Sequence, residues 1–342
     1  MGTVGTRAIR AGRGRATSRV HSDRLLVELV GLRVHTPVIA ASGTFGYGSE
    51  YLRLQDFPVE SLGGFVLKTC TLRPRLGNPE PRIVETPGGL INSIGLQNVG
   101  MDALISEKLP ELRQYHTNVI VSIAGFTVDE YREMAAKLAA CGDLEAIEVN
   151  ISCPNVEKDG RNFAHDPRAA AAVTRAIRKA KLSVPIIVKL SPNAPDPIEV
   201  GLACADAGAD AVSLVNTFLG MAVDVERRRP ILHMNYGGVS GPAVKPLALA
   251  LVARMATELR EHGLNTPLIG IGGIQTGRDA LEFLIAGAAA VAVGTANFFE
   301  PTICQAIVGD IADYCKRHET TVADITGTLR MYPTPSHDKE EK

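Results

Sequence analysis

Short, nearly continuous apolar runs rich in Val and Ile recur along the middle of the chain. Runs of this kind are typical of parallel strands that are buried on both faces. The sequence predicts eight such strands, at residues 37–42, 64–69, 118–124, 146–152, 185–190, 211–216, 267–272 and 289–294.

Segments with helical periodicity lie between most of these runs. Residues 129–140, for example, place polar and apolar side chains on opposite faces of a helix. We expect helices at 129–140, 167–181, 197–207, 246–262, 278–286 and 301–318. Strand–helix alternation repeated eight times predicts the α/β class and a (β/α)8 TIM barrel. A doubly wound open sheet is the alternative, although it rarely needs eight parallel strands.

The two ends of the chain differ from the middle. Residues 1–24 contain six Arg and show no periodicity, so we expect a basic, disordered tail, with a targeting or docking segment as the alternative. No change of composition interrupts residues 25–330, which we predict to be one catalytic barrel domain. Residues 331–342 are predicted to be a charged C-terminal tail.

Charge and cysteine content exclude several classes of protein. The 342 residues include 36 Lys and Arg against 37 Asp and Glu, which argues against a nucleic-acid binder that relies on bulk charge. No apolar run is long enough to span a membrane, and no apolar export signal is present, so we expect a cytoplasmic protein. The six cysteines form no CxxC pair, so no metal site is predicted.

Polar residues follow the predicted strands at their carboxyl ends, where the chemistry of such barrels takes place. Lys68, Asn150, Lys189 and Asn216 all lie at these positions. Cys153 follows the fourth strand in the segment SCPN, where the proline turns the chain into a loop. A thiol among lysines and amides can act as a base or a nucleophile.

Glycines after the last two strands indicate a phosphate site. Gly272 ends the seventh strand and is followed by Gly273, and Gly294 ends the eighth and is followed by Thr295. Glycines there allow backbone N–H groups to approach a phosphate. The ligand could be a phosphorylated substrate or a cofactor such as FMN. The amide-rich segment 92–98 and the long segment 216–242 are further candidate binding loops.

These segments together resemble those of the dihydroorotate dehydrogenases over residues 25–325. The resemblance rests on the following motifs in this order: VLKT (66–69), NSIGLQN (92–98), NISCPNV (150–156), VKLS (188–191), NT (216–217), SGP (240–242) and the two glycine loops. It implies an FMN-containing barrel, with FMN at the carboxyl ends of the strands, that oxidises dihydroorotate to orotate in pyrimidine biosynthesis.

The resemblance also implies a role for individual residues. Cys153 is similar to the base that removes the C5 proton while the C6 hydride passes to FMN. Substrate-binding positions are matched by Lys68, Asn92, Ser93, Ile94, Gly95, Leu96, Asn150, Asn155, Asn216 and Thr217. FMN-binding positions are matched by Ser42, Lys68, Thr69, Ser122, Asn150, Lys189, Val215, Gly241, Gly272, Gly273, Gly294 and Thr295. Ser122 stands where the family often has Asn.

With Cys153 as the base and no amphipathic membrane-binding helix before the barrel, the chain resembles the soluble class of the family. Within that class, Gln97 in NSIGLQN resembles the NAD-linked form, class 1B. This class implies a partner subunit that carries FAD and a [2Fe–2S] cluster, in a heterotetramer of two plus two chains. The alternatives are the fumarate-linked class 1A and a dihydropyrimidine dehydrogenase-like flavoenzyme. A tRNA dihydrouridine synthase, a Schiff-base aldolase using Lys189 and a non-catalytic docking barrel are further competing hypotheses.

Overall fold

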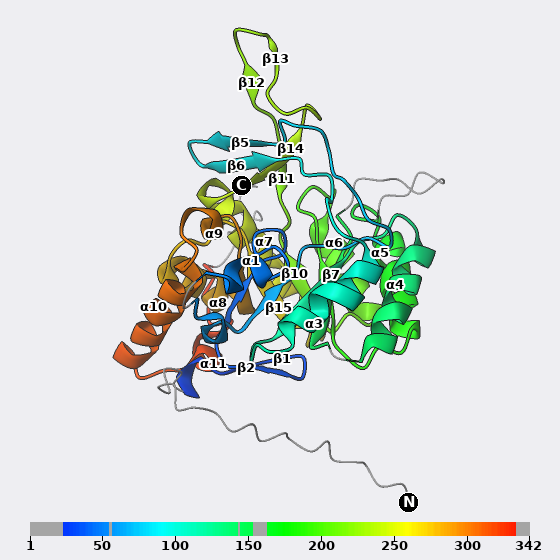
Figure 1. The fold of residues 1–342 in the computed structure, drawn as a ribbon. Coiled ribbons are helices and arrows are strands. Elements are labelled where there is room, and N and C mark those ends of the chain that lie inside the picture. The colour runs from blue at the N-terminus through cyan, green and yellow to red at the C-terminus, as the bar shows by residue number, and fades with distance from the viewer. Residues whose placement is uncertain (1–22, 55–56, 143, 153–162, 333–342) are drawn as a thin grey trace, which may run out of the picture.

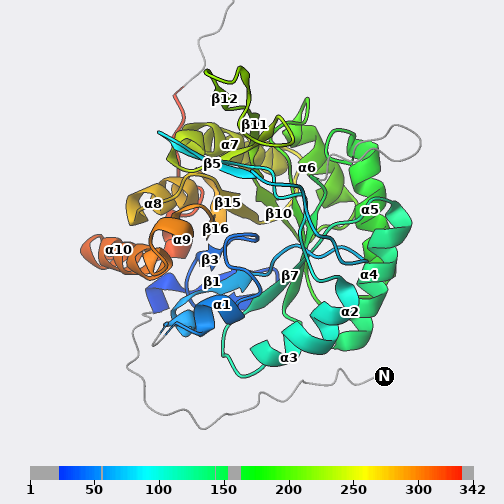
Figure 2. The ribbon, with the colours of Figure 1, turned by 45° about the horizontal axis from the view of Figure 1, so that its top comes forward.

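The centre of the molecule is a closed barrel of parallel strands surrounded by helices (Figures 1 and 2). The computed structural model describes residues 23–54, 57–142, 144–152 and 163–332. Strands follow one another around the barrel in chain order, and the last strand pairs with the first. The prediction of a (β/α)8 barrel is therefore confirmed.

Each barrel strand coincides with one of the predicted apolar runs, and only the last begins one residue earlier than predicted. Nearly all of their residues are buried, as expected for strands with helices outside and packed side chains inside. The strands are β3 (Val38–Ala40), β4 (Gly64–Val66), β7 (Val119–Ile123), β8 (Ala146–Asn150), β9 (Ile186–Lys189), β10 (Ala211–Leu214), β15 (Leu268–Ile271) and β16 (Ala288–Val293).

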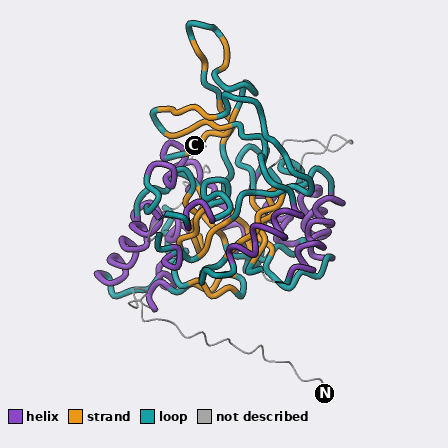
Figure 3. The backbone as a smooth tube through the Cα atoms, viewed as in Figure 1, coloured by secondary structure: helices purple, strands orange, loops and turns teal. Residues whose placement is uncertain are grey.

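Helices form the outer layer, and the six predicted ones are present (Figure 3). Side chains at their N-termini explain where several begin: Thr127, Asp166, Asp196 and Thr276 each accept a hydrogen bond from the first turn. The helices are α1 (Ser49–Leu52), α2 (Met101–Ala103), α3 (Leu109–Leu112), α4 (Val128–Cys141), α5 (Pro167–Lys179), α6 (Pro197–Asp206), α7 (Lys245–Glu261), α8 (Gly277–Ala286), α9 (Ala296–Phe299), α10 (Ile303–Arg317) and α11 (Val322–Ile325). Single turns of 3₁₀ helix lie at η1 (Asp23–Leu25), η2 (Val59–Ser61) and η4 (Pro242–Val244), and η3 (Leu104–Lys108) is π-helical.

A four-stranded antiparallel sheet lies beyond the carboxyl ends of the barrel strands (Figure 1). We call it the roof sheet, and it consists of β5 (Ile83–Thr86), β6 (Gly89–Asn92), β11 (Phe218–Gly220) and β14 (Gly237–Ser240). The segment 216–242 was expected to be an irregular loop, and this was wrong, because it contributes β11 and β14 to the roof sheet. The same segment forms a projecting hairpin of β12 (Val223–Asp224) and β13 (Arg229–Pro230).

A further hairpin, β1 (Val27–Leu29) with β2 (Leu32–Val34), lies at the opposite end of the barrel. Just before it, Arg24 donates hydrogen bonds to the carbonyl oxygens of Cys315 and Thr320, so the last residues of the predicted tail 1–24 contact the barrel domain. The rest of that tail, and most of the predicted tail 331–342, lie outside the described residues. None of the helices in the described part of the chain is long and apolar enough to cross a membrane.

Candidate active site

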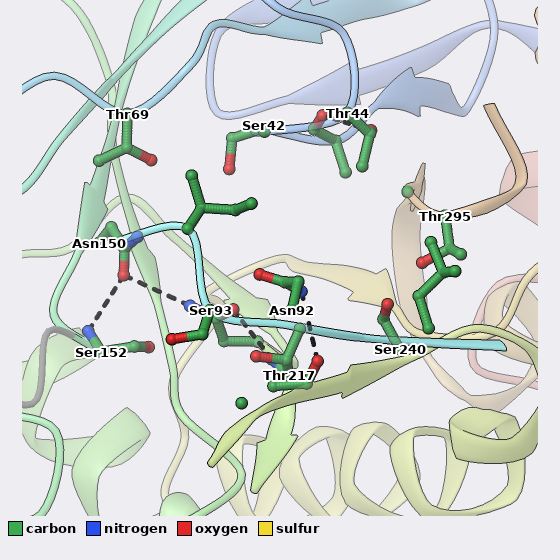
Figure 4. A pocket seen from close by; sticks show the side chains of 18 of the residues that line it. Ser42, Thr44, Thr69, Asn92, Ser93, Asn150, Ser152, Thr217, Ser240 and Thr295 are labelled. Atoms are coloured by element: carbon green, nitrogen blue, oxygen red, sulfur yellow. Dashed lines mark hydrogen bonds between the residues drawn. The ribbon is translucent and has the colours of Figure 1, made fainter. Parts of the chain in front are cut away.

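A cavity of about 1180 Å³ lies at the carboxyl ends of the barrel strands, beneath the roof sheet (Figure 4). It brings together residues that were singled out in separate segments of the sequence. Its lining includes Ser42, Lys68, Thr69, Asn92, Ser93, Ile94, Gly95, Leu96, Asn150, Lys189, Val215, Asn216, Thr217, Gly241, Gly272, Gly273, Gly294 and Thr295. Cys153 and Asn155 lie outside the described residues.

Two lysines from different strands bring positive charge to the cavity. Lys189 ends β9 and is 5 % exposed, and its Nζ donates a hydrogen bond of 3.2 Å to Ser42 Oγ. Lys68 follows β4, and its backbone N–H donates to the carbonyl oxygen of Gly46 at 2.7 Å. Burial lowers the pKa of Lys68, and the positive charge of Lys189 lowers it further. The cavity is therefore suited to a ligand that carries or develops negative charge.

Amide side chains form a second group in the cavity, on the strands that flank Lys189. Asn150 Oδ1 accepts hydrogen bonds from the backbone N–H of Ser152 at 3.1 Å and from Asn216 Nδ2 at 3.4 Å (Figure 4). Asn216 Oδ1 in turn accepts from the backbone N–H of Thr217 at 2.9 Å. These bonds fix the amide planes, so the remaining donors and acceptors present a set pattern to a planar polar ligand.

Asn92 enters the cavity from above, because it is the last residue of β6 in the roof sheet. Its Nδ2 donates to the carbonyl oxygen of Gly238 in β14 at 3.3 Å, which ties two strands of the roof sheet at the cavity (Figure 4). In the same segment, Asn98 is buried and donates to Thr71 Oγ1 and to the carbonyl oxygen of Leu96. These hydrogen bonds therefore fix the side chains of Asn92 and Asn98.

The glycines after β15 allow other parts of the chain to pack closely against the backbone at the edge of the cavity. Gly273 has φ +71°, and a Cβ there would lie 2.8 Å from the backbone N of Lys245 and 2.9 Å from the carbonyl oxygen of Gly241. Gly272 has φ +136°, also a conformation that favours glycine. A Cβ on Gly294, after β16, would make ordinary van der Waals contacts of 3.9 Å with Ala41 and Thr44. Among the described residues, no group of three His, Cys, Asp or Glu side chains could hold a metal ion.

We expect Gly273→Ala to lower the free energy of unfolding by about 1–3 kcal/mol, because the methyl group meets backbone atoms at a positive φ. Urea denaturation of the full chain measures this. Gly294→Ala is the matched control, because its new methyl group would meet no atom closer than 3.9 Å. Equal stability of the two variants would contradict the prediction.

The structure places one expected residue elsewhere. Ser122 is fully buried in β7 and is not among the residues that line the cavity. Its hydroxyl donates to Glu148 Oε1 at 2.9 Å and shares a hydrogen bond with Thr69 Oγ1, also at 2.9 Å. The shorter side chain thus contacts the barrel interior, and Thr69 stands between it and the cavity.

Sequence reasoning missed several polar residues of the lining. Ser191 lies two residues after Lys189 and could have been found from that spacing. Asn193 donates to the carbonyl oxygen of Thr217 at 3.0 Å and accepts from the backbone N–H of Leu219, so it holds the chain that follows Asn216. Thr44 lines the cavity beside Ser42, and no motif marked it.

Comparison of the sequence with known proteins identifies its family. A family model described as dihydroorotate dehydrogenase matches residues 24–314. The chain belongs to the dihydroorotate dehydrogenase family. The resemblance in the sequence motifs is thereby confirmed.

Curated members of the dihydroorotate dehydrogenase family match nearly the whole chain. A protein of Geobacter sp. (strain M21), named dihydroorotate dehydrogenase B (NAD(+)), catalytic subunit, is 51 % identical over 306 residues, which cover 89 % of this chain and 98 % of that protein. The protein of the same name from Geobacter sulfurreducens is 50 % identical over 301 residues, covering 88 % and 95 %. A crystal structure of DHODH in complex with ferulenol from Eimeria tenella matches with a TM-score of 0.76 at 23 % identity, covering 93 % and 91 %, and shares the fold.

Proposed function

We propose that this chain oxidises dihydroorotate to orotate with bound FMN, and that the electrons pass to NAD⁺ through a partner subunit. The observation that carries the proposal is the single cavity in which strand-end lysines, a group of amides and two glycine turns meet. The names of the relatives, at about half identity over most of both chains, support this substrate, this acceptor and a catalytic-subunit role.

The described residues fit FMN. Gly272, Gly273 and Gly294 line the cavity without side chains, so their backbone N–H groups would be open to a phosphate, and Lys189 and Lys68 supply positive charge in the same cavity. When bound, FMN supplies a two-electron acceptor. A reduced flavin is anionic, and a preorganised ammonium group stabilises such developing charge at no cost of reorganisation during the reaction.

Dihydroorotate is a cyclic ureide with a carboxylate, and the amide group of the cavity suits both parts. Asn92 from the roof sheet and Asn150 with Asn216 from the barrel would bind the ring from two sides. Lys68 would pair with the carboxylate, which is the reason we assign it to substrate as well as to cofactor. Fixed partners on several elements hold the reacting atoms in line.

Cys153 is proposed as the base that takes the C5 proton, on the strength of its place in the SCPN motif. The residue before it lies at the site. Ser152 lines the cavity, and its backbone N–H is held by Asn150 Oδ1 at 3.1 Å. The SCPN motif therefore begins at the cavity, next to Asn150, which we propose to bind the substrate.

Delivery of electrons to NAD⁺ requires a second redox centre in this proposal. We assign FAD and a [2Fe–2S] cluster to a separate subunit, in a complex of two catalytic and two electron-transfer chains. The term "catalytic subunit" in the relatives' names supports such a division of labour. The fumarate-linked alternative would need no such partner.

The test is anaerobic spectroscopy of the purified chain after reconstitution with FMN. Addition of dihydroorotate is expected to bleach the visible flavin absorbance with release of orotate. Fumarate and NAD⁺ are then offered as acceptors. Reoxidation by NAD⁺ only in the presence of the partner subunit supports the whole proposal.

Reoxidation by fumarate alone, at the rate of turnover, would replace the NAD-linked assignment with the fumarate-linked one. A chain that stays colourless after reconstitution would contradict the flavin proposal itself. In that case borohydride trapping of an adduct on Lys189 would test an aldolase.

A further inference from the structure

A carboxylate lies inside the barrel, and the proposed reaction has given it no role. Glu148 is in the middle of β8 and is 3 % exposed. Its Oε1 accepts the hydrogen bond from Ser122, and its Oε2 lies 4.0 Å from Lys189 Nζ. A buried carboxylate is costly unless it is paired and hydrogen-bonded, and Glu148 has both kinds of partner.

The strand register explains these contacts. Glu148 pairs with Ser122 across β7 and β8, and Asn150 pairs with Lys189 across β8 and β9. Residues two apart in a strand point to the same side, so Glu148 lies on the face of β8 that carries Asn150, one layer deeper in the barrel. Glu148 is therefore directly beneath the floor of the cavity.

Five polar side chains from five neighbouring parts of the barrel form one connected series, which we call the polar belt. Its members are Thr69, Ser122, Glu148, Lys189 and Ser42, linked by contacts of 2.9, 2.9, 4.0 and 3.2 Å in that order. Thr69, Lys189 and Ser42 line the cavity, whereas Ser122 and Glu148 do not. The centre of the polar belt thus supports residues that face the ligand.

Glu148 also changes the charge beneath the ligand. Lys68 and Lys189 are close enough for the charge of Lys189 to lower the pKa of Lys68. Glu148 is the acidic partner within salt-bridge distance of Lys189 among the described residues. A carboxylate at this place offsets part of the positive charge that the bound group would experience.

We propose that Glu148 is a positioning residue for the flavin reaction. It holds Lys189 by charge and Thr69 through Ser122, and it limits how strongly the site favours reduced over oxidised flavin. This inference rests on the proposed binding of FMN.

The decisive variant is Glu148→Gln, which keeps the size of the side chain and an acceptor for Ser122 but removes the charge. Loss of the negative charge should stabilise the anionic reduced flavin. We expect the ratio of affinities for reduced and oxidised FMN to rise about tenfold, which raises the midpoint potential by about 30 mV for a two-electron couple. Redox titration of the holoprotein and FMN binding by fluorescence measure the two quantities.

Two further variants separate charge from structure. Glu148→Asp keeps the charge, so its ratio of affinities for reduced and oxidised FMN should be closer to that of the original protein than the ratio of Glu148→Gln. Ser213→Ala alters a neighbour of Lys189 in the strand register whose buried hydroxyl has no hydrogen-bond partner within the described residues. This matched control should leave the affinity ratio within twofold of the original.

An affinity ratio within twofold of the original in Glu148→Gln would overturn the inference. If Glu148→Gln does not fold, the double variant Glu148→Gln/Lys189→Met should fold, because no unbalanced charge remains. Failure of the double variant to fold would also overturn it. Absence of FMN binding by the unaltered chain would instead contradict the proposed function, so the two failures are distinguishable.

Discussion

Replacing Cys153 with Ser is expected to slow the reduction of bound flavin by dihydroorotate about 10²–10⁴-fold near neutral pH. A serine hydroxyl gives up its proton far less readily than a thiol, so it is a poor source of the basic form at this pH. FMN binding should remain, because the described contacts proposed for FMN come from other residues. Anaerobic stopped-flow absorbance measures the rate, and the visible spectrum measures the bound flavin.

The dependence of the rate on pH is a second test of the assignment of Cys153 as the base. The rate of the serine variant should keep rising with pH, since more of the hydroxyl is deprotonated at each step. Cys141→Ser is the matched control: Cys141 ends α4 on the outside of the barrel, and its variant should reduce flavin at the original rate. A Cys153→Ser variant with the original rate would refute the assignment of the base.

Replacing Lys189 with Met is expected to lower the free energy of unfolding by about 3–5 kcal/mol, because Glu148 is left as an unbalanced buried carboxylate. The pair is almost fully buried, with side-chain exposures of 6 % and 3 %, so solvent screens it little. Urea denaturation of the chain measures the loss. FMN binding should weaken as well, since the cavity loses one of its two lysines.

Two comparisons show whether the loss comes from the buried pair. The double variant Lys189→Met/Glu148→Gln should recover most of the stability, because the pair is removed as a pair. Lys137→Met removes the exposed ion pair with Asp102 and should unfold at the original urea concentration. Equal destabilisation by the Lys189 and Lys137 variants would contradict the prediction.

The barrel was predictable because each of its strands is marked by an apolar run in its own local sequence. Buried parallel strands such as β3 and β9 are mainly apolar on both faces, so a local run of Val and Ile suffices to locate them. Positions at the ends of such strands then follow from the fold, which is why Lys189 and Asn216 were found together in the cavity.

The roof sheet and the place of Ser122 were not predictable in this way. Strands β6 and β14 are four residues each and pair across about 150 positions of the chain, so no local periodicity marks them. The neighbour of Ser122 depends on the register of β7 against β8, which the sequence of one strand does not contain. Contacts that depend on register and distant pairing are therefore visible only in three dimensions.

The closure of β16 onto β3 has a consequence for how the protein is made. Ser42, near the start of the barrel, and Thr295, just after its last strand, line the same cavity. A growing chain on the ribosome has neither a closed barrel nor a complete cavity until nearly three hundred residues have emerged. The proposed binding of FMN therefore requires nearly the whole chain, and a chain interrupted before β16 would lack the strand that closes the barrel.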